Sequence, residues 1–263
     1  MLHKRDAFTL IELLVVIAII VLLVSVLMPA LAMAKKQARA VACKANLHHW
    51  SLVFSMYLGD SEGKFCEFSS DTEHIWIATL RPYYKDQDIC LCPTTLKSWR
   101  DGASGTFAAY DWRAAENDLQ DEMFDYYAQS YGSYGKNSWL SQCDWEGRGT
   151  LCWREMNDVT AGSNVPLLLD CNFLGGFPYD RDTPPSYDGY FNVGDAEITR
   201  YCINRHSGYV NSLFADYSVR KVGLKGLWAL KWHRQFDTNG PWTRAGGVRA
   251  DDWPEWMRGF KEY

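Results

Sequence analysis

The chain has 263 residues, of which 47% are hydrophobic and 22% are charged, so it is long enough for one membrane helix and one sizeable folded domain. Residues 1–58 carry six basic and two acidic side chains, a net charge of +4, whereas residues 59–263 carry 21 basic and 30 acidic ones, a net charge of −9. An acidic C-terminal domain argues against nonspecific binding to nucleic acid.

A long apolar run at residues 13–34 follows the basic residues Lys4 and Arg5. As a helix it would measure roughly 33 Å, enough to cross a hydrocarbon core of about 30 Å. Three interpretations compete: a cleaved secretory signal peptide ending at the small-x-small residues 32–34, an uncleaved signal anchor, and a signal that is cut before the apolar run. The run is long for a signal peptide, and two lysines follow it directly, which disfavours the first interpretation.

Residues 7–12 read Ala-Phe-Thr-Leu-Ile-Glu. They resemble the box of type IV prepilins and type II secretion pseudopilins, which usually has Gly at the position of Ala7. In that family a prepilin peptidase cuts before the Phe and methylates the new amine. The resemblance therefore implies a leader at residues 1–7, cleavage between Ala7 and Phe8, and N-methylation of Phe8.

The same resemblance implies a location and partners. The protein would be a single-pass inner-membrane protein whose head lies in the periplasm or in an extracellular filament. Its partners would be other pilin or pseudopilin subunits, and no nucleic acid is expected. The function that follows is a pilin-like structural subunit of a type II secretion pseudopilus or of a type IV pilus-like filament, anchored in the membrane before assembly.

Glu12 is an ionisable residue in an apolar segment, where a charge is costly without a partner. The resemblance implies that partner, the Phe8 amine of a neighbouring subunit, so that Glu12 would act in assembly. The simpler alternative is that Glu12 lies at the level of the lipid headgroups and is solvated. Pro29 falls where many pilins carry a helix-kinking proline, and it predicts a kink because proline removes one backbone hydrogen bond.

The N-terminal helix is predicted to span residues 8–58, with a transmembrane or filament-core part at 8–34 and an amphipathic part at 35–58. Three- and four-residue spacings predict an apolar stripe along this part of the helix. Its members are Ala34, Ala38, Val41, Ala42, Ala45, Leu52, Val53 and Met56. Such a stripe needs a surface, and the domain that follows the helix is the natural one.

The resemblance implies an α+β, pilin-like fold, in which the long helix packs on an antiparallel β-sheet and residues 59–263 form a globular head with loop-rich insertions. Two apolar runs, at residues 165–170 and 211–216, are predicted to be neighbouring strands of that sheet. Other predicted elements are a strand continuing at 219–222, helices at 75–84 and 224–236, and a short strand at 89–92.

Eight cysteines, an even number, indicate an oxidising compartment. The first predicted disulfide is Cys143–Cys152, because the residues between them read as a hairpin turn. The second is Cys171–Cys202, since each cysteine borders a strand-like run. The Cys-x-Cys at residues 90–92 is too short for a zinc knuckle, and no second pair with zinc-finger spacing follows it.

The sharpest polar set is Asp170, His206 and Asp216. His206 and Asp216 resemble a His-x9-Asp-Gly pattern near the C-terminus of many prepilin-type proteins of planctomycetes and relatives, although Tyr217 stands at the Gly position. The structural interpretation is favoured: both aspartates end adjacent strands and one of them binds His206. The alternatives are a divalent-metal site and an acid–base pair.

Calcium is the one candidate cofactor, because related pseudopilins bind it in a loop near the C-terminal part of the head. Asp180, Asp182 and Asp188 could supply oxygen ligands, although their spacing is not that of an EF-hand. No motif of a known hydrolase or phosphate-binding enzyme is present, so no catalysis is expected.

Twelve tryptophans, five of them in the last 40 residues, predict an exposed aromatic patch on the tail. The alternative function is therefore a membrane-anchored head that binds a glycan or a surface, as a minor tip subunit or adhesin would.

Overall fold

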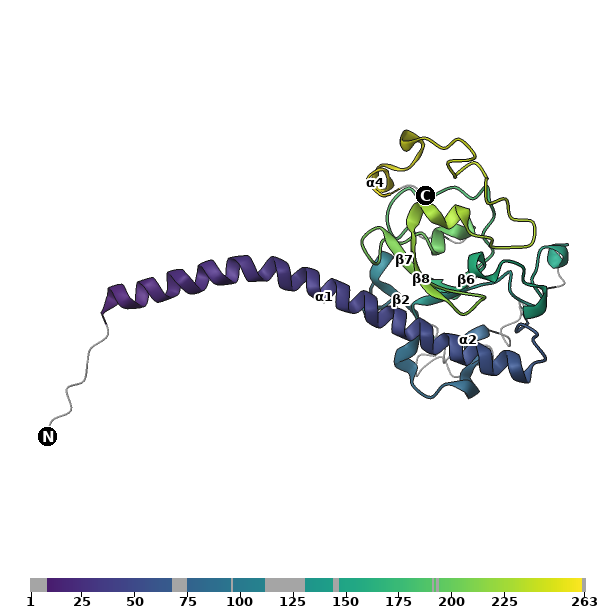
Figure 1. Ribbon diagram of the computed structural model, residues 1–263, viewed down its shortest axis with the longest axis horizontal. Coiled ribbons are helices and arrows are strands. Elements are labelled where there is room, and N and C mark those ends of the chain that lie inside the picture. The colour runs from purple at the N-terminus through teal and green to yellow at the C-terminus, as the bar shows by residue number, and fades with distance from the viewer. Residues whose placement is uncertain are drawn as a thin grey trace. The chain divides into compact units, whose positions relative to one another are not determined.

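The computed structural model describes residues 9–67, 75–95, 97–111, 131–143, 147–190, 192 and 194–261. The chain divides into two compact units, residues 1–39 and residues 40–263, and helix α1 (Leu10–Asp60) contributes to both (Figure 1). The predicted processing residues Ala7 and Phe8 lie outside the described residues.

The first unit contains the apolar part of α1. This part is long and apolar enough to cross a membrane, because no charged side chain interrupts residues 13–34. Pro29 lies inside the helix, so the backbone hydrogen bond that its nitrogen cannot donate is missing there. The kink at this position stays a prediction.

In the second unit, α1 buries one face in the head. The buried residues recur every three or four positions, which places them on one side of a helix. Trp50 and Phe54 are the largest of them. The full set is Ala40, Cys43, Leu47, Trp50, Ser51, Val53, Phe54 and Leu58.

Of the predicted apolar stripe of α1, only Val53 is buried, so the rest of that stripe does not face the head. Val41, Leu52 and Met56 are 61%, 62% and 48% exposed. The helix has two apolar faces in this region, and the face with the large aromatic rings packs on the head because it buries more apolar area.

Among the described residues, a five-stranded sheet with the order β6-β4-β5-β7-β8 forms the centre of the head (Figure 1). The pairs β4–β5, β5–β7 and β7–β8 are antiparallel, and β6 is parallel to β4. The predicted pairing of residues 165–170 with 211–216, and the strand that follows, are confirmed. The bounds are β4 Tyr134–Asn137, β5 Pro166–Asp170, β6 Gly175–Gly176, β7 Tyr209–Phe214 and β8 Val219–Gly223.

A second, three-stranded sheet consists of β1 (Lys97–Ser98), β2 (Ala108–Asp111) and β3 (Tyr131–Gly132). Most of the remaining described elements are short. The α-helices are α2 (Trp76–Thr79) and α4 (Glu255–Arg258), and the 3₁₀ helices are η2 Arg81–Tyr83, η3 Gln87–Cys90, η4 Gly105–Phe107, η5 Arg148–Thr150, η6 Met156–Asp158, η7 Gly162–Asn164, η8 Glu197–Arg200, η9 Leu224–Ala229 and η10 Ala250–Asp252.

Three predicted elements differ from the structure. The helix predicted at 75–84 is divided into α2 and the 3₁₀ helix η2. Residues 89–92 do not form a strand, because the Asp86 side chain accepts the Asp88 N–H and caps η3, which ends at Cys90. The helix predicted at 224–236 ends early, as η9, because the Lys231 N–H donates to the Asn164 carbonyl instead of to a helical partner.

The central sheet is covered on both faces. Leu168 and Leu213 belong to the hydrophobic cluster that includes Trp50 of α1, whereas Leu169 and Phe214 belong to a second cluster. Neighbouring residues along a strand point to opposite faces, which explains this division.

The tail supplies much of the second cluster, and the exposed aromatic patch predicted there is wrong. Three of its tryptophans are buried and the other two are half-buried. They pack on one another: the ring centroids of Trp228 and Trp253, and those of Trp242 and Trp253, are each 5.4 Å apart.

Candidate functional site

The first candidate site is the start of α1. The backbone N–H and the hydroxyl of Thr9 both donate to Glu12 Oε2, at 2.9 and 2.7 Å, and the Glu12 N–H donates back to Thr9 Oγ1 at 3.3 Å. This reciprocal arrangement is a capping box, which satisfies backbone donors at a helix N-terminus. Glu12 therefore has an intramolecular role that neither predicted interpretation included.

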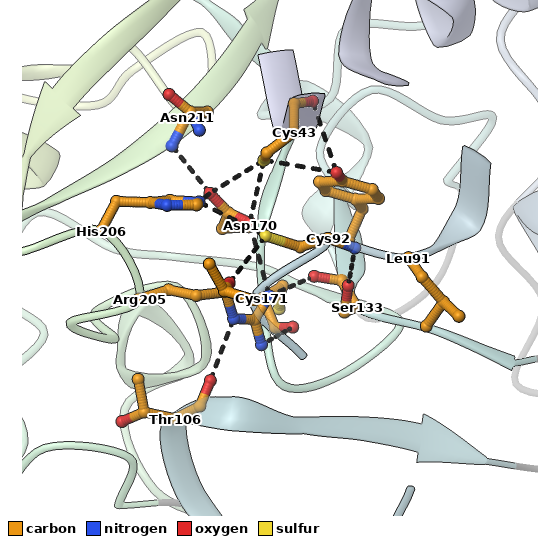
Figure 2. Close-up of polar contacts among 12 residues, drawn as sticks. Cys43, Leu91, Cys92, Thr106, Ser133, Asp170, Cys171, Arg205, His206 and Asn211 are labelled. Carbon is orange, nitrogen blue, oxygen red and sulfur yellow. Dashed lines mark hydrogen bonds and ion pairs between the residues drawn. The ribbon is translucent and has the colours of Figure 1, made fainter. Parts of the chain in front are cut away.

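The second candidate site lies in the head, where four buried side chains from distant segments meet (Figure 2). One is on α1, one follows η3, one ends β5 and one precedes β7. Their sulfur, oxygen and nitrogen ligand atoms all lie within 4.8 Å of one another. We call this set the ligand cluster; its members are Cys43, Cys92, Asp170 and His206.

Close contacts connect the members of the ligand cluster. His206 Nε2 is 3.1 Å from Asp170 Oδ2 and 3.4 Å from Cys92 Sγ. Cys43 Sγ donates to Asp170 Oδ1 at 3.5 Å. The four residues are 0 to 5% exposed, so water does not screen these contacts.

Arg205 is a buried cation beside the ligand cluster (Figure 2). Its guanidinium lies 3.5 Å from Asp170 Oδ1 and donates to backbone carbonyls, among them that of Ser133 at 2.6 Å and that of Cys171 at 3.1 Å. The Asn211 N–H donates to Asp170 Oδ2 at 2.8 Å. The carboxylate thus has a charged partner and a backbone donor, as a buried charge requires.

These contacts shift the pKa values of the cluster. Burial by itself raises the pKa of Asp170, but His206, Arg205 and the Asn211 N–H outweigh it and hold that pKa at about 2. Burial lowers the pKa of His206, and Asp170 and Cys92 more than reverse this, to about 9. Burial also acts to raise the pKa of Cys92, yet hydrogen bonds from Cys43 and His206 hold it below its usual value.

The N-terminal segment matches a known sequence motif. Residues 2–28 match the family model described as the prokaryotic N-terminal methylation motif. The chain has a prepilin-type N-terminus. The matched segment contains Thr9 and Glu12 and runs directly into the long apolar part of α1, as in a prepilin or pseudopilin. Comparisons of the chain with curated proteins and with solved structures give no significant match.

Asp216, the third residue of the predicted polar set, does not belong to the ligand cluster. Asp216 is exposed in the turn after β7, where its Oδ1 accepts the N–H and the hydroxyl of Ser218 at 3.0 and 2.6 Å. His206 contacts Asp170, as predicted, whereas Asp216 does not end a strand, because β7 ends two residues earlier at Phe214. Tyr217 has φ +65°, a conformation that glycine adopts more readily.

Two of the three predicted calcium residues accept hydrogen bonds from backbone N–H groups through their carboxylates. Asp182 Oδ2 accepts the N–H groups of Tyr179 and Ile198, both at 3.1 Å. Asp188 Oδ1 accepts the Asn204 N–H at 2.8 Å. Within the part of the chain that the structure describes, these carboxylates belong to no group of three ligands that could share an ion; the third predicted residue is Asp180.

One predicted disulfide is confirmed and one is wrong. Cys143 and Cys152 are bonded. Cys171 and Cys202 are free and buried, because each thiol packs against another neighbour. The Cys171 sulfur accepts the backbone N–H of Phe173 at 3.4 Å, and Cys202 Sγ lies 3.8 Å from the Met257 sulfur.

Sequence reasoning missed half of the ligand cluster. Cys43 is 127 residues from Asp170, and Cys92 is 114 residues from His206, so no local spacing connects them. The sequence offered one usable signal: Cys43 falls on the three- and four-residue repeat of the face of α1 that is buried.

Proposed function

We propose that this prepilin-like protein is a structural subunit of a type II secretion pseudopilus or a type IV pilus-like filament, and that it acts by assembly and not by catalysis. The observation that carries the proposal is the methylation motif at residues 2–28, which continues into an uninterrupted helix with a wholly apolar first part. Prepilin peptidase would remove residues 1–7, and α1 would anchor the subunit in the inner membrane until it joins a filament.

The exposed apolar face of α1 supports assembly through helix packing. At 100° per residue, Val41, Leu52 and Met56 lie within about 60° of one another, and Trp50 and Phe54 lie roughly opposite. A soluble domain rarely leaves such a row of large aliphatic side chains exposed without a partner. We expect a second copy of α1 to cover this face, because the N-terminal part of the same helix is also apolar and would pack beside it in a bundle of helices.

Glu12 would have two tasks. In the isolated subunit it caps its own helix through Thr9. In the filament its carboxylate would also accept a hydrogen bond from the methylated amine of Phe8 in the neighbouring subunit. An ion pair in an apolar environment is sensitive to the position of both charges, so it would fix the register between subunits.

Glu12→Ala tests this function in cells of the source organism. The variant should be cleaved and retained in the membrane fraction, while the sheared filament fraction, or secretion through the system, is lost. Ser25→Ala is the matched control, because its hydroxyl only bonds back to the Leu22 carbonyl of the same helix. Filaments or secretion at the wild-type level in Glu12→Ala would show that the proposed assembly mechanism is wrong.

A second candidate function is a glycan-binding head. A cavity of about 480 Å³ lies beside the aromatic rings of Trp99 and Tyr187. Asn172 also lines it, and the buried Oδ1 of this side chain has no hydrogen-bond partner among the described residues. Aromatic faces with an amide nearby suit a sugar ring. Binding of the full chain on a glycan array, abolished by Trp99→Ala, would support this function, and an array without binding would remove it.

A further inference from the structure

The ligand cluster brings four potential metal ligands close enough to bind a single ion. Zinc holds sulfur at about 2.3 Å and nitrogen or oxygen at about 2.0–2.2 Å, so tetrahedral ligands stand roughly 3.3–3.8 Å apart. Asp170 Oδ2 lies 3.1 Å from His206 Nε2 and 3.7 Å from Cys43 Sγ, and His206 Nε2 lies 3.4 Å from Cys92 Sγ. We propose that the ligand cluster binds one zinc ion as a closed structural site.

The chemistry of the ligands selects zinc over harder cations. Two sulfurs, one imidazole nitrogen and one carboxylate oxygen converge. Calcium and magnesium prefer six or more oxygen ligands, whereas thiolate with imidazole in a four-ligand set is typical of zinc. All four side chains are buried, and four protein ligands without an open position are typical of structural rather than catalytic zinc sites.

Arg205 completes the charge balance of such a site. Zinc binding requires Cys43 and Cys92 as thiolates and His206 as the neutral imidazole. With the Asp170 carboxylate, the ligands then carry three negative charges, and the zinc ion and Arg205 together carry three positive ones. A buried centre without excess charge avoids the large cost of an uncompensated ion, and the Arg205 side chain is fully buried against Asp170.

Groups around the cluster hold its ligands in place. The Asn211 N–H donates to Asp170 Oδ2 at 2.8 Å, and the Tyr134 hydroxyl donates to Cys43 Sγ at 3.3 Å. The ring of Tyr209 stacks on the imidazole of His206, with centroids 5.6 Å apart. Such outer contacts orient metal ligands before the ion binds and raise the affinity of a site.

A zinc ion here would tie the helix to the sheet. Its ligands come from α1, from the segment after η3, from the end of β5 and from the turn before β7. The free energy of zinc binding to such a site is also free energy of folding. A competing state is a Cys43–Cys92 disulfide, which would remove both thiolates; the two states exclude each other.

Metal analysis of the full chain, purified in detergent under reducing conditions, tests the proposal. After reconstitution with zinc and removal of the excess, we expect about one zinc ion per chain. Reconstitution with cobalt should give the charge-transfer absorption of cobalt–thiolate bonds and the visible bands of tetrahedral cobalt. Chelation should lower the thermal unfolding midpoint, and added zinc should restore it.

Two cysteine variants distinguish zinc bound by the ligand cluster from zinc bound by other thiols. Under the same conditions, the zinc retained by Cys92→Ser should be lower than that of the wild type by a factor of about ten or more. Cys66→Ser, which removes a buried free thiol outside the cluster, should retain as much as the wild type. The proposal is overturned if the wild-type chain retains no zinc and gives no tetrahedral cobalt spectrum, if Cys92→Ser retains the wild-type amount, or if mass spectrometry of the freshly isolated protein finds Cys43 bonded to Cys92.

Discussion

Asp182→Asn should make the protein more stable at neutral pH and leave its stability unchanged in acid. The Asp182 carboxylate is largely buried and accepts the N–H groups of Tyr179 and Ile198. Burial raises its pKa to about 6, and the charges of Glu197 and Asp180 add to this effect, while the two N–H groups oppose it.

The raised pKa fixes the sign of the effect. The folded state binds this proton more tightly than the unfolded chain, whose carboxyl group has a pKa of 3.8. The contribution to stability is therefore fully present below pH 3.8 and is lost as the pH rises through about 6. A shift of about two pKa units corresponds to about 3 kcal/mol. The Asn side chain keeps an oxygen that can accept both N–H groups, and it does not ionise. The variant therefore avoids the loss of stability that ionisation of Asp182 causes.

The assay is denaturant unfolding of the full chain in detergent, followed by tryptophan fluorescence between about pH 4 and about pH 8. The two proteins should have equal unfolding free energies at the acidic end and differ by up to about 3 kcal/mol at the other. Asp237→Asn is the control, because Asp237 is an exposed carboxylate that accepts a turn N–H, from Asn239, at 2.9 Å. A difference between Asp182→Asn and the wild type that stays constant with pH would refute the reasoning.

Burial lowers the pKa of His233 to about 4, and the charge of Lys231 adds to this shift. The unfolding free energy should therefore fall as the pH drops from 6.5 to about 4. In the same unfolding assay, His233→Gln should remove about 3 kcal/mol of that fall. Leu52→Glu should reduce filament yield at least roughly tenfold without changing the unfolding midpoint, whereas Leu52→Met should leave both unchanged. Replacing Cys143 and Cys152 by Ser should lower the unfolding free energy by about 3 kcal/mol, because their bond closes a loop with a sequence separation of 9; an unchanged denaturation midpoint would contradict this.

The N-terminal segment could be interpreted from the sequence because the features that define it lie in consecutive residues. The methylation motif and the apolar run are both short linear segments, and the matched residues 2–28 contain the motif and most of the run. The capping role of Glu12 could have been predicted too, since Thr9 and Glu12 have the spacing of a capping box. In the isolated subunit this carboxylate caps α1, and in the proposed filament it would also bind the Phe8 amine of a neighbouring subunit.

The strands were predictable where burial is complete. Every residue of β5 is buried, so its apolar run stands out, and the same holds for most of β7. The ends of strands were not predictable, and Asp216 was assigned to β7 although the chain already turns at Phe214. The burial of α1 was ambiguous because both of its faces are apolar, and only the rings of Trp50 and Phe54 distinguish the face that packs on the head.

The ligand cluster could be predicted only in part. The sequence predicts that His206 binds either Asp170 or Asp216, and in the structure its partner is Asp170, at 3.1 Å. Cys43 and Cys92 were not associated with them, because the fold alone brings together residues more than 100 positions apart. Zinc-finger spacing applies to sites built on one short segment, and this cluster uses four segments.

The central claim is that a prepilin peptidase processes this chain into a filament subunit. The most direct test is the N-terminal residue of the mature protein from the source organism, with its methylation state, by mass spectrometry. The account predicts N-methylated Phe8. A chain that begins at Lys35, after the small residues at the end of the apolar run, or one that retains its first seven residues, would contradict it.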